Sequence, residues 1–232
     1  MKNTFTSIVV LSYNRKDYLQ KSLESLWANT TSPYELIIVD DGSDKETQDY
    51  VYKLVENKRI SSAIFNCGKN MGIGTGINRG FNLAQGRYLV KADADILYKP
   101  RWLEEMLSII SYKKAGCVGG FKYYHDPVQF DKMLLEEKKY AYKVKDFVSS
   151  VFLTTRYLYN KMGIESFSDA FAEDVGFKTK LRKRGYDLYL TKEDLLENFG
   201  FGLERSTLFT PESTPEKIEV IKIAKEPLIF NT

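Results

Sequence analysis

The amino-acid sequence predicts an α/β fold, in which helices flank a mostly parallel central sheet as in Rossmann-like domains. Two observations lead to this prediction. Short, continuously apolar runs rich in β-branched residues, typical of strands covered on both faces, alternate along the first half with segments of helical spacing. Several of these runs also end in polar or acidic residues. Strands of an open parallel sheet end in this way at the edge where ligands bind.

The first strands and helices show the clearest pattern. Phe5–Leu11 (FTSIVVL) is a continuous apolar run, and Arg15–Trp27 places its large apolar side chains at helical spacing. We expect further strands at Glu35–Val39, Ala63–Phe65, Tyr88–Lys91 and Ala115–Phe121, and helices over Thr47–Val55, from the glycine-rich passage Gly68–Gly80 to near Gly86, and after Pro100.

The second half of the chain is less regular. The elements expected there are an amphipathic helix over Phe130–Val144, a strand over Phe147–Thr154, helices over Arg156–Met162 and Glu173–Arg184, and strands over Tyr186–Leu190 and Leu195–Phe199. The polar tail contains three prolines and is expected to be a flap. Because no clear linker interrupts the chain, we expect one domain over residues 1–203, followed by the tail over residues 204–232.

Composition narrows the possible functions. The net charge of +3 is too small for a typical nucleic-acid-binding domain, so no nucleic-acid partner is expected. Cys67 and Cys117 form no paired motif, which favours a reducing compartment, and no apolar run reaches the length of a membrane span. We therefore expect a cytoplasmic protein without a transmembrane segment; peripheral attachment to a membrane and the oligomeric state stay open. His125 is the only histidine, which excludes mechanisms that need a histidine pair.

Polar side chains follow three of the predicted strands. The segments are Ser12-Tyr13-Asn14, Asp40-Asp41 and Asp93-Ala94-Asp95. In a parallel sheet these strand ends meet at one edge, and carboxylates at alternate positions can converge on one ion. Oxygen ligands without sulfur or imidazole suit Mg²⁺ or Mn²⁺, which also bind diphosphate oxygens. An acidic triplet of this kind is weak evidence alone, because aspartates that cap helices give the same pattern.

Six segments, in order between Ser7 and Gly202, resemble the family 2 glycosyltransferases of the GT-A fold. They are SIVVLSYNR, ELIIVDDGS, KNMGIGTGINRG, LVKADADI, CVGG and AEDVGFKTKLRKRGY. The resemblance implies transfer of a monosaccharide, with inversion, from a nucleoside-diphosphate sugar of the UDP, GDP or dTDP type to a hydroxyl of a carbohydrate, polysaccharide or lipid-linked glycan acceptor. It also implies Mn²⁺ or Mg²⁺ as cofactor, a nucleotide-sugar half at about residues 1–98 and an acceptor half at residues 99–203.

The resemblance also implies roles for single residues. Tyr13 would pack against the nucleotide base, and Asp41 would accept a hydrogen bond from the base edge. Asp95 would be the direct metal ligand, with Asp93 near the ribose and the metal. The other implied residues are Leu11, Asn70, Gly72, Asn78 and Ala94 around the nucleotide-sugar, Asn198 as a further metal ligand, and Gly120 and Glu173 on the acceptor side.

Asp174 matches the family's general base, which takes the proton of the acceptor hydroxyl as that hydroxyl attacks. An acid in the first turn of a helix is also explained by the helix dipole alone. The sequence departs from the family at two places. Gly176 stands where many members carry an acid, and Asn198 takes the place of a metal-binding histidine. The metal would then be held by the Asn198 amide oxygen as well, or by Asp95 and the diphosphate of the donor.

A dense run of basic residues follows Asp174. A solvated helix surface is the usual explanation, and contact with a diphosphate or an anionic acceptor is the alternative. The run consists of Lys178, Lys180, Arg182, Lys183 and Arg184.

Three other functions fit parts of the sequence. The glycines of Gly72–Gly76 suggest a dinucleotide-binding dehydrogenase, but they follow the third strand and position 77 is isoleucine, so we reject it. A sugar nucleotidyltransferase would carry a glycine- and arginine-rich loop after the first strand, where this chain has Ser12–Arg15. A non-catalytic nucleotide-sugar or glycan-binding protein on the same scaffold remains the main alternative.

Overall fold

The computed structural model describes residues 5–66, 70–120, 127–147, 150–163, 167, 173–200, 218–222 and 230. The helices are α1 (Lys16–Asn29), α2 (Lys45–Glu56), α3 (Ile73–Leu83), α4 (Trp102–Ile110), α5 (Pro127–Met133), α6 (Arg156–Met162) and α7 (Glu173–Lys183). The strands are β1 (Thr6–Ser12), β2 (Tyr34–Asp40), β3 (Ser62–Asn66), β4 (Tyr88–Asp93), β5 (Ile96–Tyr98), β6 (Ala115–Gly119), β7 (Leu134–Glu137), β8 (Ala141–Val144), β9 (Val151–Thr155), β10 (Asp187–Thr191), β11 (Leu196–Asn198) and β12 (Ile218–Lys222).

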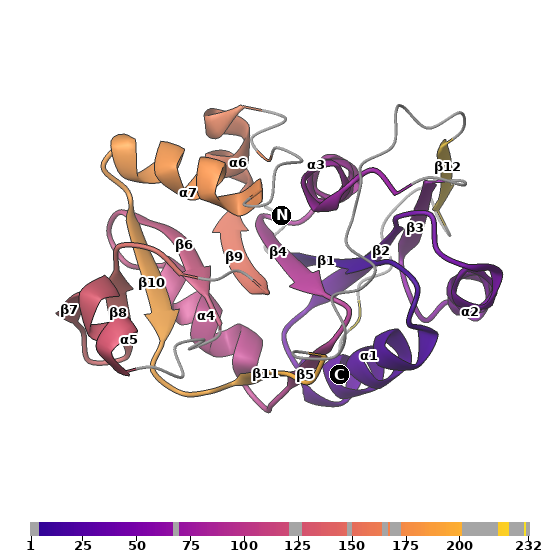
Figure 1. Ribbon diagram of the computed structural model, residues 1–232, viewed down its shortest axis with the longest axis horizontal. Coiled ribbons are helices and arrows are strands. Elements are labelled where there is room, and N and C mark those ends of the chain that lie inside the picture. The colour runs from indigo at the N-terminus through magenta and orange to yellow at the C-terminus, as the bar shows by residue number, and fades with distance from the viewer. Residues whose placement is uncertain are drawn as a thin grey trace.

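One large sheet runs through the described part of the chain (Figure 1). Its ten strands lie in the order β12-β3-β2-β1-β4-β9-β6-β10-β8-β7, and β11 pairs separately with β5. Within this sheet β12, β9 and β8 run against the other seven strands. The prediction of a mostly parallel sheet flanked by helices is therefore confirmed. Strands β1, β2 and β4 lie side by side and end at the same edge.

Helices cover both faces of the sheet, as the apolar runs predicted. In β1, Ile8 and Val10 belong to one buried cluster with side chains of α1, α2 and α4. Val9 belongs to a second cluster, on the opposite face, with side chains of α3, α6 and α7. Figure 1 shows α3, α6 and α7 above the sheet and α1 and α4 below it. Because successive side chains of a strand point to opposite faces, a strand covered on both faces is apolar at most of its positions.

Helix α3 lies unusually close to the sheet. A Cβ atom at Gly80 would overlap Cγ1 of Val9, and one at Gly76 would lie 3.1 Å from Cδ2 of Leu11. The glycines of this helix therefore allow close approach of its backbone to β1. This approach also fixes the first turn of α3 beside the ends of β1 and β2.

One predicted helix is wrong. Residues 130–144 do not form an amphipathic helix, because the end of α5 is followed by the antiparallel strands β7 and β8. Lys138 N donates to the Ala141 carbonyl oxygen at 2.8 Å and closes the turn between them. Strand β8 then pairs with the edge of β10, with Val144 opposite Leu188. Pairing with a distant strand has overridden the local helical spacing.

The tail contributes to the sheet where it is described. Strand β12 pairs antiparallel with β3, and Phe230 forms a bridge with Tyr34. For these residues the expectation of a flap is wrong, and the rest of the tail lies outside the described residues. Several other element boundaries also differ from prediction; for example, the strand predicted from Phe147 begins at Val151, and α4 begins at Trp102, two residues after Pro100. None of the described helices has both the length and the apolar character that a bilayer crossing requires.

Candidate active site

A cavity of about 280 Å³ lies at the edge where β1, β2 and β4 end. Most of the residues implied around a nucleotide-sugar line it. These are Leu11, Tyr13, Asp41, Asn70, Gly72, Asp93, Ala94 and Asp95. The cavity is also lined by Ser12, Asn14, Arg15, Tyr18, Val39, Ile73 and Gly76. Tyr13 is 40% exposed, so an aromatic face is available at the cavity wall.

The two carboxylates of the acidic triplet each face a cation. Lys91 Nζ lies 2.5 Å from Asp93 Oδ1, and the Lys91 side chain is only 3% exposed. Arg15 Nη1 lies 3.9 Å from Asp95 Oδ2. Burial, and then the nearby Asp93 carboxylate, raise the pKa of Asp95 to about 6, although Arg15 and Lys91 act in the opposite direction.

Asn198 lies beside the acidic triplet although it is 103 positions away from Asp95 in the sequence. Strand β11 pairs antiparallel with β5, which places Asn198 opposite Ile96. Asn198 Nδ2 donates to Asp95 Oδ1 at 3.2 Å, and Asn198 Oδ1 accepts from Gly200 N at 3.0 Å. The main chain is joined as well, because Phe199 N donates to the Asp95 carbonyl oxygen at 3.1 Å. Asp95 and Asn198, both expected as metal ligands, are thus in direct contact.

The oxygen atoms gathered here fit a divalent cation. Asp93 and Asp95 supply carboxylates, a donor type that Mg²⁺ and Mn²⁺ prefer. The Asn198 amide faces Asp95 with its Nδ2, so it would have to turn to offer its oxygen to a metal. The pKa of Asp95 is raised first by burial and then by Asp93, and Arg15 and Lys91 offset these two effects only in part. Within the described ranges, no three side chains of His, Cys, Asp or Glu lie grouped as a metal site.

Asp41 holds the loop before α3. Its Oδ1 accepts from Asn66 Nδ2 at 2.6 Å and from Met71 N at 2.8 Å, and its Oδ2 accepts from Gly72 N at 2.8 Å. Gly72 has a φ of 97°, which glycine adopts without the strain other residues would suffer. Asp41 therefore shapes one wall of the cavity through three hydrogen bonds.

The neighbouring Asp40 lies in a different environment. Its side chain is fully buried, and Oδ1 accepts from Ser43 N at 3.0 Å. Oδ2 has no hydrogen-bond partner among the described residues. Burial raises the pKa of Asp40 to about 6. Of the two adjacent aspartates, only Asp41 lines the cavity.

Several implied site residues lie elsewhere. Asn78 is buried in α3, where its Nδ2 donates to the Phe167 carbonyl oxygen at 2.9 Å, and it does not line the cavity. Gly120 follows β6, where a Cβ atom would overlap Cδ1 of Leu196. Glu173 and Asp174 are the first two residues of α7, and their side chains lie outside the described atoms.

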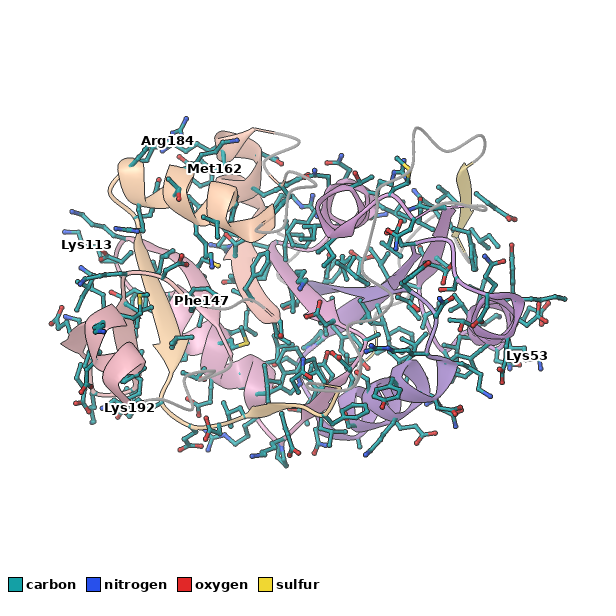
Figure 2. All side chains as sticks on the ribbon, in the orientation of Figure 1. Lys53, Lys113, Phe147, Met162, Arg184 and Lys192 are labelled. Carbon is teal, nitrogen blue, oxygen red and sulfur yellow. The ribbon has the colours of Figure 1, made fainter. Side chains whose placement is uncertain are left out.

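The basic run after Asp174 is divided in the structure. Lys178 is 3% exposed, its Nζ lies 2.6 Å from Asp146 Oδ1, and it also contacts the Phe147 carbonyl oxygen. Lys178 is therefore neither a solvated side chain nor a surface contact for an anion. Figure 2 shows Arg184 on the outside of the molecule, whereas Phe147 lies in its interior. The solvated-surface interpretation holds for Arg182, Lys183 and Arg184, which are exposed.

Sequence reasoning missed Arg15 as a residue of the cavity. Asn14 and Arg15 have φ angles of 55° and 57°, in the left-handed region that asparagine tolerates better than most residues. The asparagine after β1 is a weak signal of this bend. No signal in the sequence indicates that the arginine after it turns towards Asp95.

Comparisons with known proteins bear on this fold and this site. A family model described as glycosyl transferase family 2 matches residues 7–172 of the chain. An uncharacterized glycosyltransferase from Nostoc sp. is 30% identical over 151 residues, which cover 64% of this chain and 45% of that protein. An uncharacterized glycosyltransferase from Methanocaldococcus jannaschii is 24% identical over 208 residues, which cover 86% of this chain and 70% of that protein.

A solved structure shares the architecture. It is a mannosyltransferase from Pyrobaculum calidifontis in complex with GDP-Man and Mn²⁺, with a TM-score of 0.67 and 19% identity, over 82% of this chain and 55% of that chain. This chain thus spans about half the length of the Nostoc relative and of the mannosyltransferase. The structural likeness establishes the α/β fold as the GT-A type. Because the family model matches well over half of the residues, the chain belongs to glycosyl transferase family 2.

Proposed function

We propose that the protein is a glycosyltransferase that moves a monosaccharide from a nucleoside-diphosphate sugar to a hydroxyl acceptor, with inversion and with the help of Mn²⁺ or Mg²⁺. One observation supports this most strongly. Asp93, Asp95 and the loop held by Asp41 line a single cavity at the carboxyl ends of adjacent strands. Open α/β sheets bind nucleotides at this edge. The relative solved with GDP-Man and Mn²⁺ supports the same class of donor and metal.

The chain's residues would divide the work as follows. Tyr13 would offer its exposed ring to the base, and the wall at Gly72 would let the donor approach the backbone closely. Asp95 and Asp93, with Asn198 or the donor's diphosphate, would hold the metal, which offsets the charge that develops on the departing diphosphate. Fixing the donor in this way contributes to the rate by positioning.

Asp174 would act as the general base. The acceptor oxygen forms a bond to the anomeric carbon, the bond from that carbon to the diphosphate breaks, and the acceptor's proton passes to the Asp174 carboxylate. The match of the segment AEDVGFKTKLRKRGY to the family motif supports this role. Asp174 lies in the first turn of α7, which packs on β6 and β10. Attack from the side opposite the leaving group gives inversion.

The test is a panel of UDP-, GDP- and dTDP-sugars, each with Mn²⁺, Mg²⁺ or EDTA. We expect one donor class to raise the melting temperature only with metal, and to be hydrolysed slowly to the nucleoside diphosphate. Asp95→Ala should abolish both effects. Asp44→Ala is the matched control, because Asp44 caps α2 and does not line the cavity. Stabilisation without turnover, with any acceptor, would favour a binding protein, and no stabilisation by any donor would refute the proposal.

A further inference from the structure

The backbone before α1 is bent so that Arg15 enters the cavity. Asn14 and Arg15 are both left-handed, which costs on the order of 1 kcal/mol for a residue with a side chain. Two hydrogen bonds hold the bend: Asn14 N donates to Ser43 Oγ at 2.8 Å, and Asp44 N donates to Asn14 Oδ1 at 2.7 Å. The bend therefore depends on the loop after β2, beside the Asp41 wall.

The guanidinium of Arg15 lies between an aromatic ring and an acid. Its Cζ is 5.5 Å from the centre of the Tyr18 ring, and its Nη1 is 3.9 Å from Asp95 Oδ2. Tyr18 in turn stacks on Phe199 at 5.2 Å, next to Asn198 and Gly200. The Arg15 side chain is 40% exposed, so it can move without unpacking the core. Lys16, the next residue, faces away and pairs with Glu46 at 2.9 Å.

The charges at the acidic triplet show what the position of the Arg15 side chain does for ligand binding. Asp93 is paired with Lys91, whose buried side chain is held in place. Asp95 is paired with Arg15, whose partly exposed side chain is able to move away from it. A divalent cation added alone would meet two carboxylates that already face two cations. A nucleoside diphosphate brings several negative charges, and a guanidinium binds phosphate oxygens in a bidentate way.

We propose that Arg15 is a built-in counter-cation of the donor site. It partly offsets the charge of Asp95 in the empty site and so opposes binding of a divalent metal alone, and it turns to the diphosphate when a donor binds. This inference rests on the proposed function. Its consequence is that metal and nucleotide bind cooperatively, and that part of their mutual coupling passes through one side chain.

The experiment compares Arg15→Gln with Lys16→Gln, which removes the same charge from the adjacent residue. Binding of Mn²⁺ alone is measured by electron paramagnetic resonance, and binding of UDP, GDP and dTDP in EDTA by calorimetry. We expect Arg15→Gln to bind Mn²⁺ alone about three- to tenfold more tightly and the nucleotide alone about three- to tenfold more weakly. This size is expected when one charge is removed a few ångströms from the ligand in a medium of high dielectric constant. Lys16→Gln should change neither value.

A second variant guards against a folding defect. Arg15→Gly removes the same charge and suits a φ of 57°, so it should fold at least as well and show the same opposed changes. Unchanged or weaker Mn²⁺ binding in both Arg15 variants, or an equal change in Lys16→Gln, would overturn the role of Arg15 and leave the proposed function standing. If the unmodified protein binds neither Mn²⁺ nor any of the three nucleotides, both proposals fail.

Discussion

Asp41 and Gly72 are joined by a hydrogen bond of 2.8 Å from the Gly72 N–H to Asp41 Oδ2. This bond ties the end of β2 to the start of α3 across 31 positions of sequence. Oδ1 of the same carboxylate accepts from Met71 and Asn66. The wall of the cavity is therefore built around one buried acid rather than by the loop itself.

Replacing Asp41 with alanine should weaken both the fold and the site. The change leaves two backbone donors and an amide without their acceptor, which costs about 2–4 kcal/mol of unfolding free energy. Nucleotide binding should fall at least tenfold, because the wall at Gly72 loses its position. Urea unfolding and calorimetry measure the two effects. Asp44→Ala should cost about 1 kcal/mol as a lost helix cap while leaving binding intact. Equal binding by Asp41→Ala and the unmodified protein would contradict this account.

Gly200 sets the position of Asp95. A Cβ atom at Gly200 would overlap Oδ2 of Asp95 and lie 2.8 Å from the Asp95 Cβ. Gly200→Ala should therefore displace the carboxylate and weaken metal-dependent nucleotide binding by tenfold or more. Gly185→Ala is the control: its φ of 79° makes alanine strained there, but nothing lies near the added carbon. The control should lose about 1 kcal/mol of stability without loss of binding. Unchanged metal-dependent nucleotide binding by Gly200→Ala would contradict a role for Gly200 in positioning the Asp95 carboxylate.

Asp40 should make stability depend on pH. Burial raises its pKa from 3.8 to about 6, so the native state holds the proton more tightly than the unfolded chain does. Its contribution to stability is then full below about pH 4 and is lost as the pH rises to about 6, a change of at most about 3 kcal/mol. In Asp40→Asn this loss disappears. Urea unfolding should be measured at several pH values between 4 and 8. The unfolding free energy of Asp40→Asn, relative to that of the unmodified protein, should rise up to about pH 6 and stay constant above it. A constant difference would refute the assignment.

Asp174→Asn should slow sugar transfer without weakening donor binding. The amide cannot accept the proton of the acceptor hydroxyl, so transfer should fall by at least a hundredfold while donor binding stays within about twofold. Single-turnover rates and donor affinity measure the two. Lys180→Gln, on the same helix, is a control for a change of charge in α7. Turnover retained by Asp174→Asn would remove this residue from the mechanism.

Much of the fold could be predicted because its signal is local. Strands β1 and β2 are buried on both faces, so most of their residues are apolar, and α6 has the bounds that were predicted. The hairpin of β7 and β8 could not be predicted in this way, since its pairing depends on β10, more than forty residues away. The same holds for β5, which is three residues long and is defined by its pairing with β11.

The cavity was predictable where residues follow strands. Tyr13, Asp41, Asp93 and Asp95 come to one edge because parallel strands end there. Asn78 shows where this reasoning stops. Ile73 and Gly76 lie on the face of α3 towards the cavity, and Asn78, two positions further round the helix, faces Phe167. A sequence motif does not show which face of a helix is turned towards the cavity.

Strand β9 has a consequence for how this molecule can change shape. It lies between β4 and β6 and is hydrogen-bonded to both, with Val151 opposite Ala92 and Phe152 opposite Gly119. The strands on the two sides of β9 thus form one continuous sheet within the described part of the chain. Rotating the strands on one side of β9 against those on the other would break the main-chain hydrogen bonds that join β9 to β4 and β6.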